Sequence, residues 1–298
     1  MGKILGVLCC FSLLYAHTGN AQNQRVQFTV DNGNHYEDIN LQLKSTTGRC
    51  EIVPSANYSP VYVISKSTAP SLNPTFVSEV RRQTNFVSVS LEEAPIDGLG
   101  RNLRKIFGSE EDDIHWKVYL SKHKPFNLNL QYVMGDADID LTGLPIRNLA
   151  VNTGSADVQI SYNEGSENTV DMDTFYAKVD MGSLRVNRFN LSRAREVTAD
   201  VGFGSLYLDM SDEIENQCTV TASVGAGSME VSLPAEEVPT IVYINNSALC
   251  KVKMCKSFKL LRENVYVNQA YSEEADNLLT FDIDVAMGSI RFTSNEEE

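Results

Sequence analysis

Apolar and polar residues alternate along most of the chain, and the alternation slips by one residue at a recurring glycine. In the stretch from Val197 to Met210, VTADVGFGSLYLDM, every second residue is apolar both before and after Gly204, but the two series are out of phase. A period of two is typical of a strand with one buried face. Glycine at the slip is typical of a bulge or corner, because glycine accepts positive φ angles. The pattern predicts a bent pair of strands with both halves facing the interior.

The same slip occurs six times. The glycines are Gly135, Gly154, Gly182, Gly204, Gly227 and Gly288. The first five lie 19, 28, 22 and 23 residues apart, which is typical of an array with one coil per repeat. The last interval, 61 residues, is long enough to hold coils without the signature, and we expect these coils before Gly288. The sequence therefore predicts an all-β, solenoid-like stack of bent strand pairs with a Gly-Ser bulge or corner in each repeat. A β-sandwich of bent strands is the alternative.

Four regions are expected along the chain. Residues 1–21 form a signal peptide, 22–125 an irregular β region with a charged loop or cap, 126–293 the repeat domain, and 294–298 an acidic tail. Within the second region, Gly48 with Cys50 and Ile52 forms a weak first copy of the repeat. A charged stretch at 97–116, with a short helix around Leu103 to Phe107, is expected to be an inserted loop or a cap that shields the open end of the array.

The first residues have the layout of a secretory signal. Lys3 precedes an apolar run from Ile4 to Tyr15, and small residues lead to the expected cleavage after Ala21. The run is too short for a membrane anchor, and lipidation at Cys9 or Cys10 is a minor alternative. We expect a chain exported to the periplasm or cell surface of a bacterium, with no transmembrane segment after cleavage.

Charge and cysteine content narrow the partners and the compartment. Loss of Lys3 with the signal changes the formal charge from −14 to −15, which argues against nucleic acids and anionic membrane surfaces as partners. The remaining cysteines are Cys50, Cys218, Cys250 and Cys255. In an oxidising compartment they favour two disulfides, and a zinc site at Cys250 and Cys255 is the weaker alternative.

No arrangement of residues points to catalysis. His35, His115 and His123 have no metal-ligand spacing, and the GSL triplets are not nucleophile motifs. The alternating acids Asp136, Asp138 and Asp140 fit a solvated strand face better than a calcium site. The sequence therefore predicts no catalytic, cofactor-binding or metal-binding residue, no cofactor, and a protein that is not an enzyme.

Stacking of the repeats in register would align the outward residues three positions after each glycine. These residues are Asp138, Asp157, Arg185, Tyr207, Glu230 and Arg291. In this register Asp157 and Arg185 would be cross-strand neighbours. The row is a candidate binding strip, although a row of this kind is also an ordinary soluble surface.

Segments FNLNLQYVMGDADIDLTGLPIRNLAVNTGSADVQISY, VDMGSLRVNRF and VGFGSLYLDM resemble the bacterial toast-rack domains and the related adhesin domains. They also resemble the C-terminal part of LiaF-like proteins of the cell-wall-active antibiotic response. The resemblance covers residues 126 to 292 and implies a stacked β fold at the cell envelope. It also implies adhesive or envelope-stress roles. We therefore expect a non-enzymatic, binding or adhesin-like module whose partner is an envelope protein or a cell-wall glycan. An envelope-stress accessory protein is the alternative, and a polysaccharide-acting enzyme, suggested by the alternating acids, is the second alternative.

Overall fold

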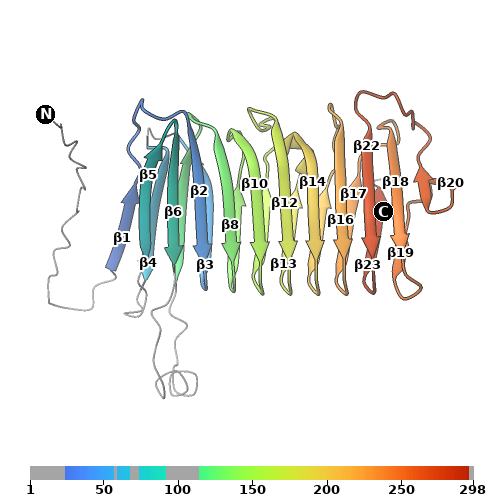
Figure 1. Cartoon of the computed structure of the whole chain (residues 1–298), viewed down its shortest axis with the longest axis horizontal. Coiled ribbons are helices and arrows are strands. Elements are labelled where there is room, and N and C mark those ends of the chain that lie inside the picture. Colours follow the sequence, from blue (N-terminus) through green and yellow to red (C-terminus); the bar gives the residue numbers. More distant parts are fainter. Residues whose placement is uncertain (1–23, 57–58, 68–73, 92–113, 295–298) are drawn as a thin grey trace, which may run out of the picture.

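The structure is a computed structural model that describes residues 24–56, 59–67, 74–91 and 114–294. The expected signal peptide, the short helix around Leu103 to Phe107 and the acidic residues after Ser294 lie outside these ranges. The described residues form two long sheets that extend together along the molecule (Figure 1).

Sheet A has eleven strands. In spatial order they are β1 (Gln24–Thr29), β4 (Val61–Ser67), β7 (His115–Ser121), β3 (Arg49–Ser55), β9 (Asp136–Asp140), β11 (Asp157–Ser161), β13 (Ser183–Asn187), β15 (Ser205–Asp209), β17 (Ser228–Leu233), β23 (Ser289–Ser294) and β19 (Lys251–Lys253).

Sheet B has twelve strands. In spatial order they are β20 (Lys259–Arg262), β21 (Val265–Val267), β18 (Thr240–Asn246), β22 (Leu279–Val285), β16 (Cys218–Val224), β14 (Ala194–Val201), β12 (Met172–Val179), β10 (Ile146–Thr153), β8 (Phe126–Tyr132), β2 (Asp38–Ser45), β6 (Thr84–Leu91) and β5 (Thr75–Arg81). A single turn of 3-10 helix, η1 (Phe189–Ser192), lies between β13 and β14.

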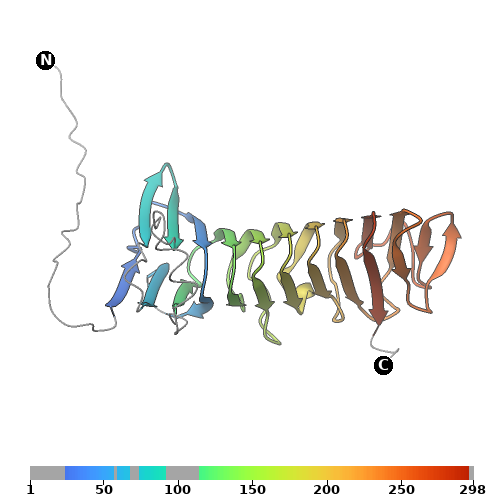
Figure 2. The same cartoon turned by 90° about the horizontal axis from the view of Figure 1, so that it is seen from below.

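From β8 to β19, successive strands alternate between the two sheets, so this part of the chain advances as a coil. β10 in sheet B leads through a corner into β11 in sheet A, and the next coil, β12 and β13, stacks on it in parallel. The coils lie side by side along one axis, as Figures 1 and 2 show from two directions. Parallel neighbours confirm the solenoid-like stack of bent strand pairs and rule out the β-sandwich.

The phase slip predicted at Gly204 is present. Val201 and Leu206 are both buried, whereas Phe203 between them points outward at the corner. The inward residues of both sheets belong to one buried cluster that runs from Val30 to Phe292. Each coil alone could not cover this apolar face, and its neighbours bury it.

Glycine is needed at most corners for a reason other than the expected one. Of the six glycines, Gly135 alone has a positive φ, of 98°. At Gly182, Gly204, Gly227 and Gly288, a Cβ atom would instead overlap the carbonyl oxygen of the corner residue in the neighbouring coil. Close approach of stacked backbones therefore requires these glycines.

The alignment of the Gly154 repeat is wrong by two residues. Gly154 N–H donates to the Tyr132 carbonyl, and in the next coil Asp180 N–H donates to the Thr153 carbonyl, so Gly154 stands level with Asp180. Ala156 holds the place that Gly182 holds, because the Gly182 backbone faces the Ala156 carbonyl. The conspicuous glycine of this repeat, Gly154, therefore stands two residues earlier in its corner than Gly182 does in the next coil.

The order of coils departs from sequence order at both ends. The coil β2–β3 lies between β6–β7 and β8–β9, and the coil β22–β23 lies between β16–β17 and β18–β19. The coil expected before Gly288 is thus β18–β19, but it stacks beyond Gly288, at the end of the array. Antiparallel strands finish the sheets: β1 and β4 in sheet A, β5 and the β20–β21 hairpin in sheet B.

The segment before residue 126 contributes strands β1 to β7 to the same two sheets. Gly48 has a positive φ of 88° and its backbone lies against Gly135, which confirms the weak first copy. Cys50 and Ile52 pair with Ala137 and Ile139 of the next coil. The division at residue 126 stays a prediction.

The disulfide prediction is wrong for this structure, in which all four cysteines of the described residues are thiols. Cys50 and Cys218 are core residues in coils that lie far apart in the array. Cys250 and Cys255 lie on either side of the extended strand β19. A disulfide between them would require Cα atoms within about 7 Å, which an extended segment between the two residues opposes.

Candidate functional site

The outward row predicted on sheet A exists and is longer than expected. Asp138, Arg185, Tyr207, Glu230 and Arg291 occupy equivalent positions on successive strands. Gln159 holds the remaining place between Asp138 and Arg185. Lys117 and Glu51 extend the row at one end, and Lys253 extends it at the other. We call this the sheet A row: Lys117, Glu51, Asp138, Gln159, Arg185, Tyr207, Glu230, Arg291 and Lys253.

Asp157, the sixth predicted member, lies outside this row. Its Cα partners are Asp136 and Ser183, one outward row closer to the corner. The expected neighbour relation with Arg185 is therefore wrong, because the Gly154 repeat was aligned two residues out of register. Asp157 instead accepts a hydrogen bond from the Ser183 hydroxyl at 2.6 Å.

Arg185 and Tyr207 form the centre of the row. The guanidinium carbon of Arg185 lies 4.2 Å from the centroid of the Tyr207 ring, which is cation–π geometry. Burial raises the pKa of Tyr207, and the nearby Asp209 charge acts in the same sense, while Ser232 and Arg185 oppose both. The phenol therefore stays protonated and can donate a hydrogen bond to a partner.

Glu51 is the centre of a basic cluster at the other end of the row. Its carboxylate lies 3.1 Å from Lys117 Nζ, 3.1 Å from His115 Nε2 and 3.7 Å from Arg49 Nε. Burial alone would raise the pKa of Glu51, but the Lys117 hydrogen bond and the three basic neighbours outweigh it and lower the pKa. The cluster is a fixed pattern of charge on the surface.

The acidic strand β9 has local partners. Asp138 lies 3.7 Å from the Arg49 guanidinium, and Asp140 accepts a hydrogen bond from Thr142 N–H at 2.9 Å. Within the described residues, no group of three or more His, Cys, Asp or Glu side chains converges as metal ligands would.

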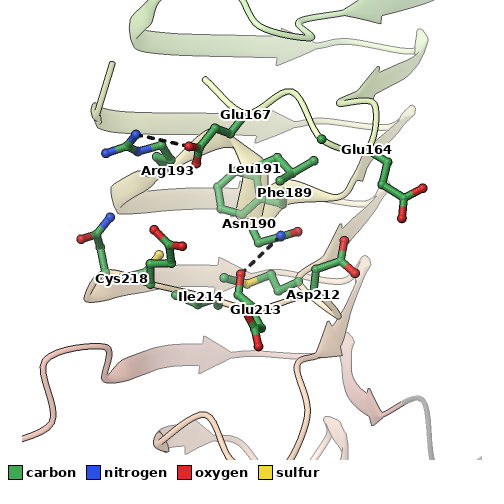
Figure 3. A pocket seen from close by; sticks show the side chains of 15 residues that line it. Glu164, Glu167, Phe189, Asn190, Leu191, Arg193, Asp212, Glu213, Ile214 and Cys218 are labelled. Atoms are coloured by element: carbon green, nitrogen blue, oxygen red, sulfur yellow. Dashed lines mark hydrogen bonds and ion pairs between the residues drawn. The ribbon is translucent and has the colours of Figure 1, made fainter. Parts of the chain in front are cut away.

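A second feature is a hollow of about 360 Å³ on the side opposite the glycine corners, which we call the return edge (Figure 3). Here the chain passes from sheet A of one coil to sheet B of the next. Its walls are the loop after β11, the helix η1 and the loop after β15. The floor includes Phe189, Met210 and Cys218. We call it the edge pocket. The sequence analysis missed it because its residues come from loops of three coils, which the repeat pattern does not describe.

Charge in the edge pocket is mostly negative. Its carboxylates are Glu164, Glu167, Asp212, Glu213 and Glu215. Arg193 lies 3.6 Å from Glu167 and 2.6 Å from Asp171, and it has a left-handed φ of 56°. Asn190 donates to the Glu213 carbonyl at 3.4 Å (Figure 3). Burial raises the pKa of the Cys218 thiol to about 12, so this thiol is not a nucleophile at neutral pH.

A third feature follows the corners themselves. Met134, Met181, Phe203 and Met287 are 59%, 67%, 76% and 61% exposed. Each is the middle residue of its corner, immediately before the glycine that faces the neighbouring coil. We call this line the corner ridge. It was not predicted, although the apolar residue before the glycine is visible in each of the four segments.

A fourth feature is a groove of about 430 Å³ on sheet B, beside the β5–β6 hairpin, which projects from the stack (teal in Figure 2). Val77, Arg81 and Phe86 line its wall, and Asn127 and Asn129 lie on its floor. Amide side chains continue away from it, since Asn148 donates to Asn127 at 2.7 Å. Uncharged amide side chains thus cover this part of sheet B, on β8 and β10.

The part of the chain that the structure describes has no helical segment with the length and apolar character of a bilayer span.

Comparisons with known proteins agree with the repeat pattern. Residues 18–182 match the family described as the N-terminal domain of toast_rack, DUF2154. The match includes the region before residue 126, which the sequence resemblance left out. No curated protein matches the chain.

Several solved structures are similar. A proposed cell adhesion protein from Clostridium sporogenes ATCC 15579 is 15% identical, with 92% of this chain and 100% of that chain covered and a TM-score of 0.45. A proposed adhesin from Parabacteroides distasonis ATCC 8503 is 14% identical, with 90% and 96% covered and a TM-score of 0.37. A proposed adhesin from Parabacteroides merdae ATCC 43184 is 11% identical, with 90% and 95% covered and a TM-score of 0.35.

Proposed function

The chain belongs to the toast-rack family, and from this premise we propose that its rack is a rigid, non-enzymatic binding module that presents one long face to a partner. The proposal includes export to the cell envelope, in the periplasm or at the cell surface, where such a module acts like an adhesin. The partner is an envelope protein or a cell-wall glycan.

The sheet A row carries this proposal. It holds nine outward residues on nine neighbouring strands, seven of them charged and of both signs, with the stacked Arg185 and Tyr207 near its middle. Arginine and tyrosine are among the residue types that contribute most to binding energy at interfaces. The parallel register fixes the distance between neighbours at about 4.8 Å, so the row is ordered before a partner arrives.

The geometry favours binding over catalysis. A catalytic centre brings a nucleophile, a base and an oxyanion-stabilising group to one point. The sheet A row instead spreads its groups along the sheet, at the spacing of the strands. Burial raises the pKa of the Cys50 thiol to about 12, as it does for Cys218, which removes both as nucleophiles at neutral pH.

Export is supported by the amino-terminal layout of Lys3, the apolar run Ile4–Tyr15 and the small residues that follow. A free amino terminus at residue 22 in the protein isolated from its host would establish it. The full-length chain in the cytoplasmic fraction would contradict it.

Capture of partners by residues 22–298 tests the binding proposal. The immobilised chain is exposed to solubilised envelope proteins and, separately, to purified cell-wall glycans of its host. We expect saturable capture from one of the two, reduced at least tenfold in the variant Arg185→Ser with Tyr207→Ser. Capture of a glycan supports the adhesin-like role, and capture of one protein supports the accessory role.

The matched control lies on the opposite face of the same coil. Tyr176 and Lys178 are outward residues of β12 in sheet B, so Tyr176→Ser with Lys178→Ser removes the same kinds of side chain from the other sheet. Equal loss in the test and control variants would refute a role for the sheet A row. No saturable capture from either source would refute the binding function.

A further inference from the structure

The carboxy-terminal end of the rack is basic although the protein is acidic. The segment from Lys251 to Arg262 contains five basic residues and no acidic residue, in a chain of formal charge −14. The five are Lys251, Lys253, Lys256, Lys259 and Arg262. All five are exposed. Net charge therefore does not describe this end of the molecule.

Topology brings these residues to one end. β19, with Lys251 and Lys253, is the last strand of sheet A, and β20, with Lys259 and Arg262, is the last strand of sheet B. Both sheets finish together at the right-hand, orange end of Figure 1. Arg291 is the Cα partner of Lys253 and extends the basic surface by one coil.

Exposed leucines accompany the basic residues. Leu249, Leu260 and Leu261 are 74%, 62% and 55% exposed, and the two last lie on the edge strand β20. Exposed leucine side chains are unfavourable in water and gain free energy when an apolar phase covers them. Basic and leucine side chains together are the chemistry of a surface that lies on anionic lipid, where the charges meet headgroups and the leucines reach the acyl boundary.

We propose that this end, composed of Leu249, Lys251, Lys253, Lys259, Leu260, Leu261 and Arg262, docks the rack end-on against an anionic lipid surface. The rest of the protein carries a net negative charge and is on average repelled by such a surface, so this end is the one that approaches it. Within a Debye length of about 8 Å the local positive charge outweighs the distant negative charge. The rack then stands away from the membrane and leaves the sheet A row accessible.

An anionic lipid surface fits these residues better than a nucleic acid or a free phosphate does. A nucleic acid or a free phosphate would use the basic side chains and leave the leucines in water. The proposal is independent of which partner the sheet A row binds, since the two surfaces share only Lys253 and the adjoining Arg291.

Vesicle co-sedimentation tests the proposal. Residues 22–298 keep every described residue and omit the apolar run Ile4–Tyr15, which would bind lipid by itself. The vesicles are phosphatidylcholine alone or an equal mixture of phosphatidylcholine and phosphatidylglycerol, in 0.1 M and 0.5 M salt, values on either side of the physiological range. We expect partitioning at least about tenfold stronger into the anionic vesicles at low salt, and its loss at high salt.

Two variants separate the charged from the apolar contribution. Lys251→Gln, Lys253→Gln and Lys259→Gln together should lower partitioning on the order of 100-fold, since each basic side chain near an anionic leaflet contributes several-fold. Leu260→Ser with Leu261→Ser should lower it about tenfold, in proportion to the apolar area withdrawn from the lipid. All substituted positions are exposed, and thermal unfolding of each variant checks that it is folded.

The matched controls remove the same number of positive charges or apolar side chains from other parts of the surface. Arg147→Gln, Lys178→Gln and Arg195→Gln remove three positive charges from sheet B, and Met181→Ser with Phe203→Ser removes two exposed apolar side chains from the corner ridge. Both controls should partition as the unmodified chain does. Equal partitioning into neutral and anionic vesicles, or equal losses in test and control variants, would overturn the proposal. So would a concentration-dependent dimer that the Lys variant abolishes without any vesicle binding, because it would assign this end to a second copy.

Discussion

Gly204 stands directly beside Gly182 in the stack, so that a Cβ atom on Gly204 would overlap the Gly182 carbonyl oxygen. The contact is between backbones of two coils, neither of which can move aside without breaking its own ladder. The Ser205 N–H donates to the same carbonyl at 3.0 Å, which holds the coils at this distance. The corner therefore has no room for added volume at Gly204.

Gly204→Ala should destabilise the fold by about 2–3 kcal/mol, the cost of forcing an extra carbon into a packed site. Gly165→Ala is the control, because Gly165 has a positive φ of 72° and nothing within 4 Å of a Cβ. Strain alone should cost about 1 kcal/mol there. Urea unfolding of both variants checks the difference. A Gly204→Ala variant as stable as the parent would show that close approach is not what requires glycine.

Asn168 joins three coils at the return edge and is fully buried. Its Oδ1 accepts from Ile146 N–H at 2.9 Å, and its Nδ2 donates to the carbonyls of Ile146 and Ser192 at 2.6 Å and 3.0 Å. Asn168→Ala leaves these buried backbone groups without a partner and should cost about 3 kcal/mol. Asn129→Ala, at an exposed position, should change stability by less than about 0.5 kcal/mol. Equal urea midpoints for the two variants would contradict this role.

The four cysteines of residues 22–298 should titrate as thiols. In the folded protein at pH 8, Cys50 and Cys218 should not react with a disulfide reagent, because burial raises the pKa of each to about 12. After unfolding in denaturant, all four should react. Fewer than four thiols in protein that was never exposed to a reductant would restore the disulfide prediction.

Glu51 should make stability depend on pH in the acidic range. Its pKa is lowered in the folded state, so its contribution is complete above the unfolded pKa of about 4.3 and is lost as pH falls through the lower folded value. Glu51→Gln should cost about 1 kcal/mol at pH 7. The difference in Tm between parent and variant should shrink as pH falls below about 4. A difference that is constant from pH 7 to pH 3 would rule out the charge as its cause.

The repeat pattern is sufficient to predict the coil because one physical constraint recurs in every copy. Two inward residues flank a corner at a fixed separation, as Val201 and Leu206 do, and nothing but a bend lets both reach the core. The alignment of one coil with the next is less well determined by the sequence, since Gly154 and Gly182 occupy different positions in the corners of their two coils. Only the hydrogen bonds between coils distinguish them.

The order of coils could not be read from the sequence. Every coil presents equivalent edges to its neighbours, so β22–β23 can follow β16–β17 while β18–β19, earlier in the chain, stacks outside it. Loop length permits either order, because the cost of closing a loop rises slowly with length.

The regular repeat also made part of the candidate site predictable. Arg185 and Tyr207 were placed together by counting from adjacent glycines, and the structure confirms the placement. The edge pocket and the basic end arise from loops and from terminal strands, where no repeat constrains position.

Side-chain footprinting of the chain with its captured partner is the most direct test of the central claim. Tyr207 and Tyr176 are outward tyrosines on opposite sheets of the same rack, and a reagent that modifies tyrosine reports on both in one experiment. The account predicts that a saturating partner lowers modification of Tyr207 several-fold and leaves Tyr176 unchanged. Unchanged modification of Tyr207, with Tyr176 protected or not, would show that the sheet A row is not the binding face.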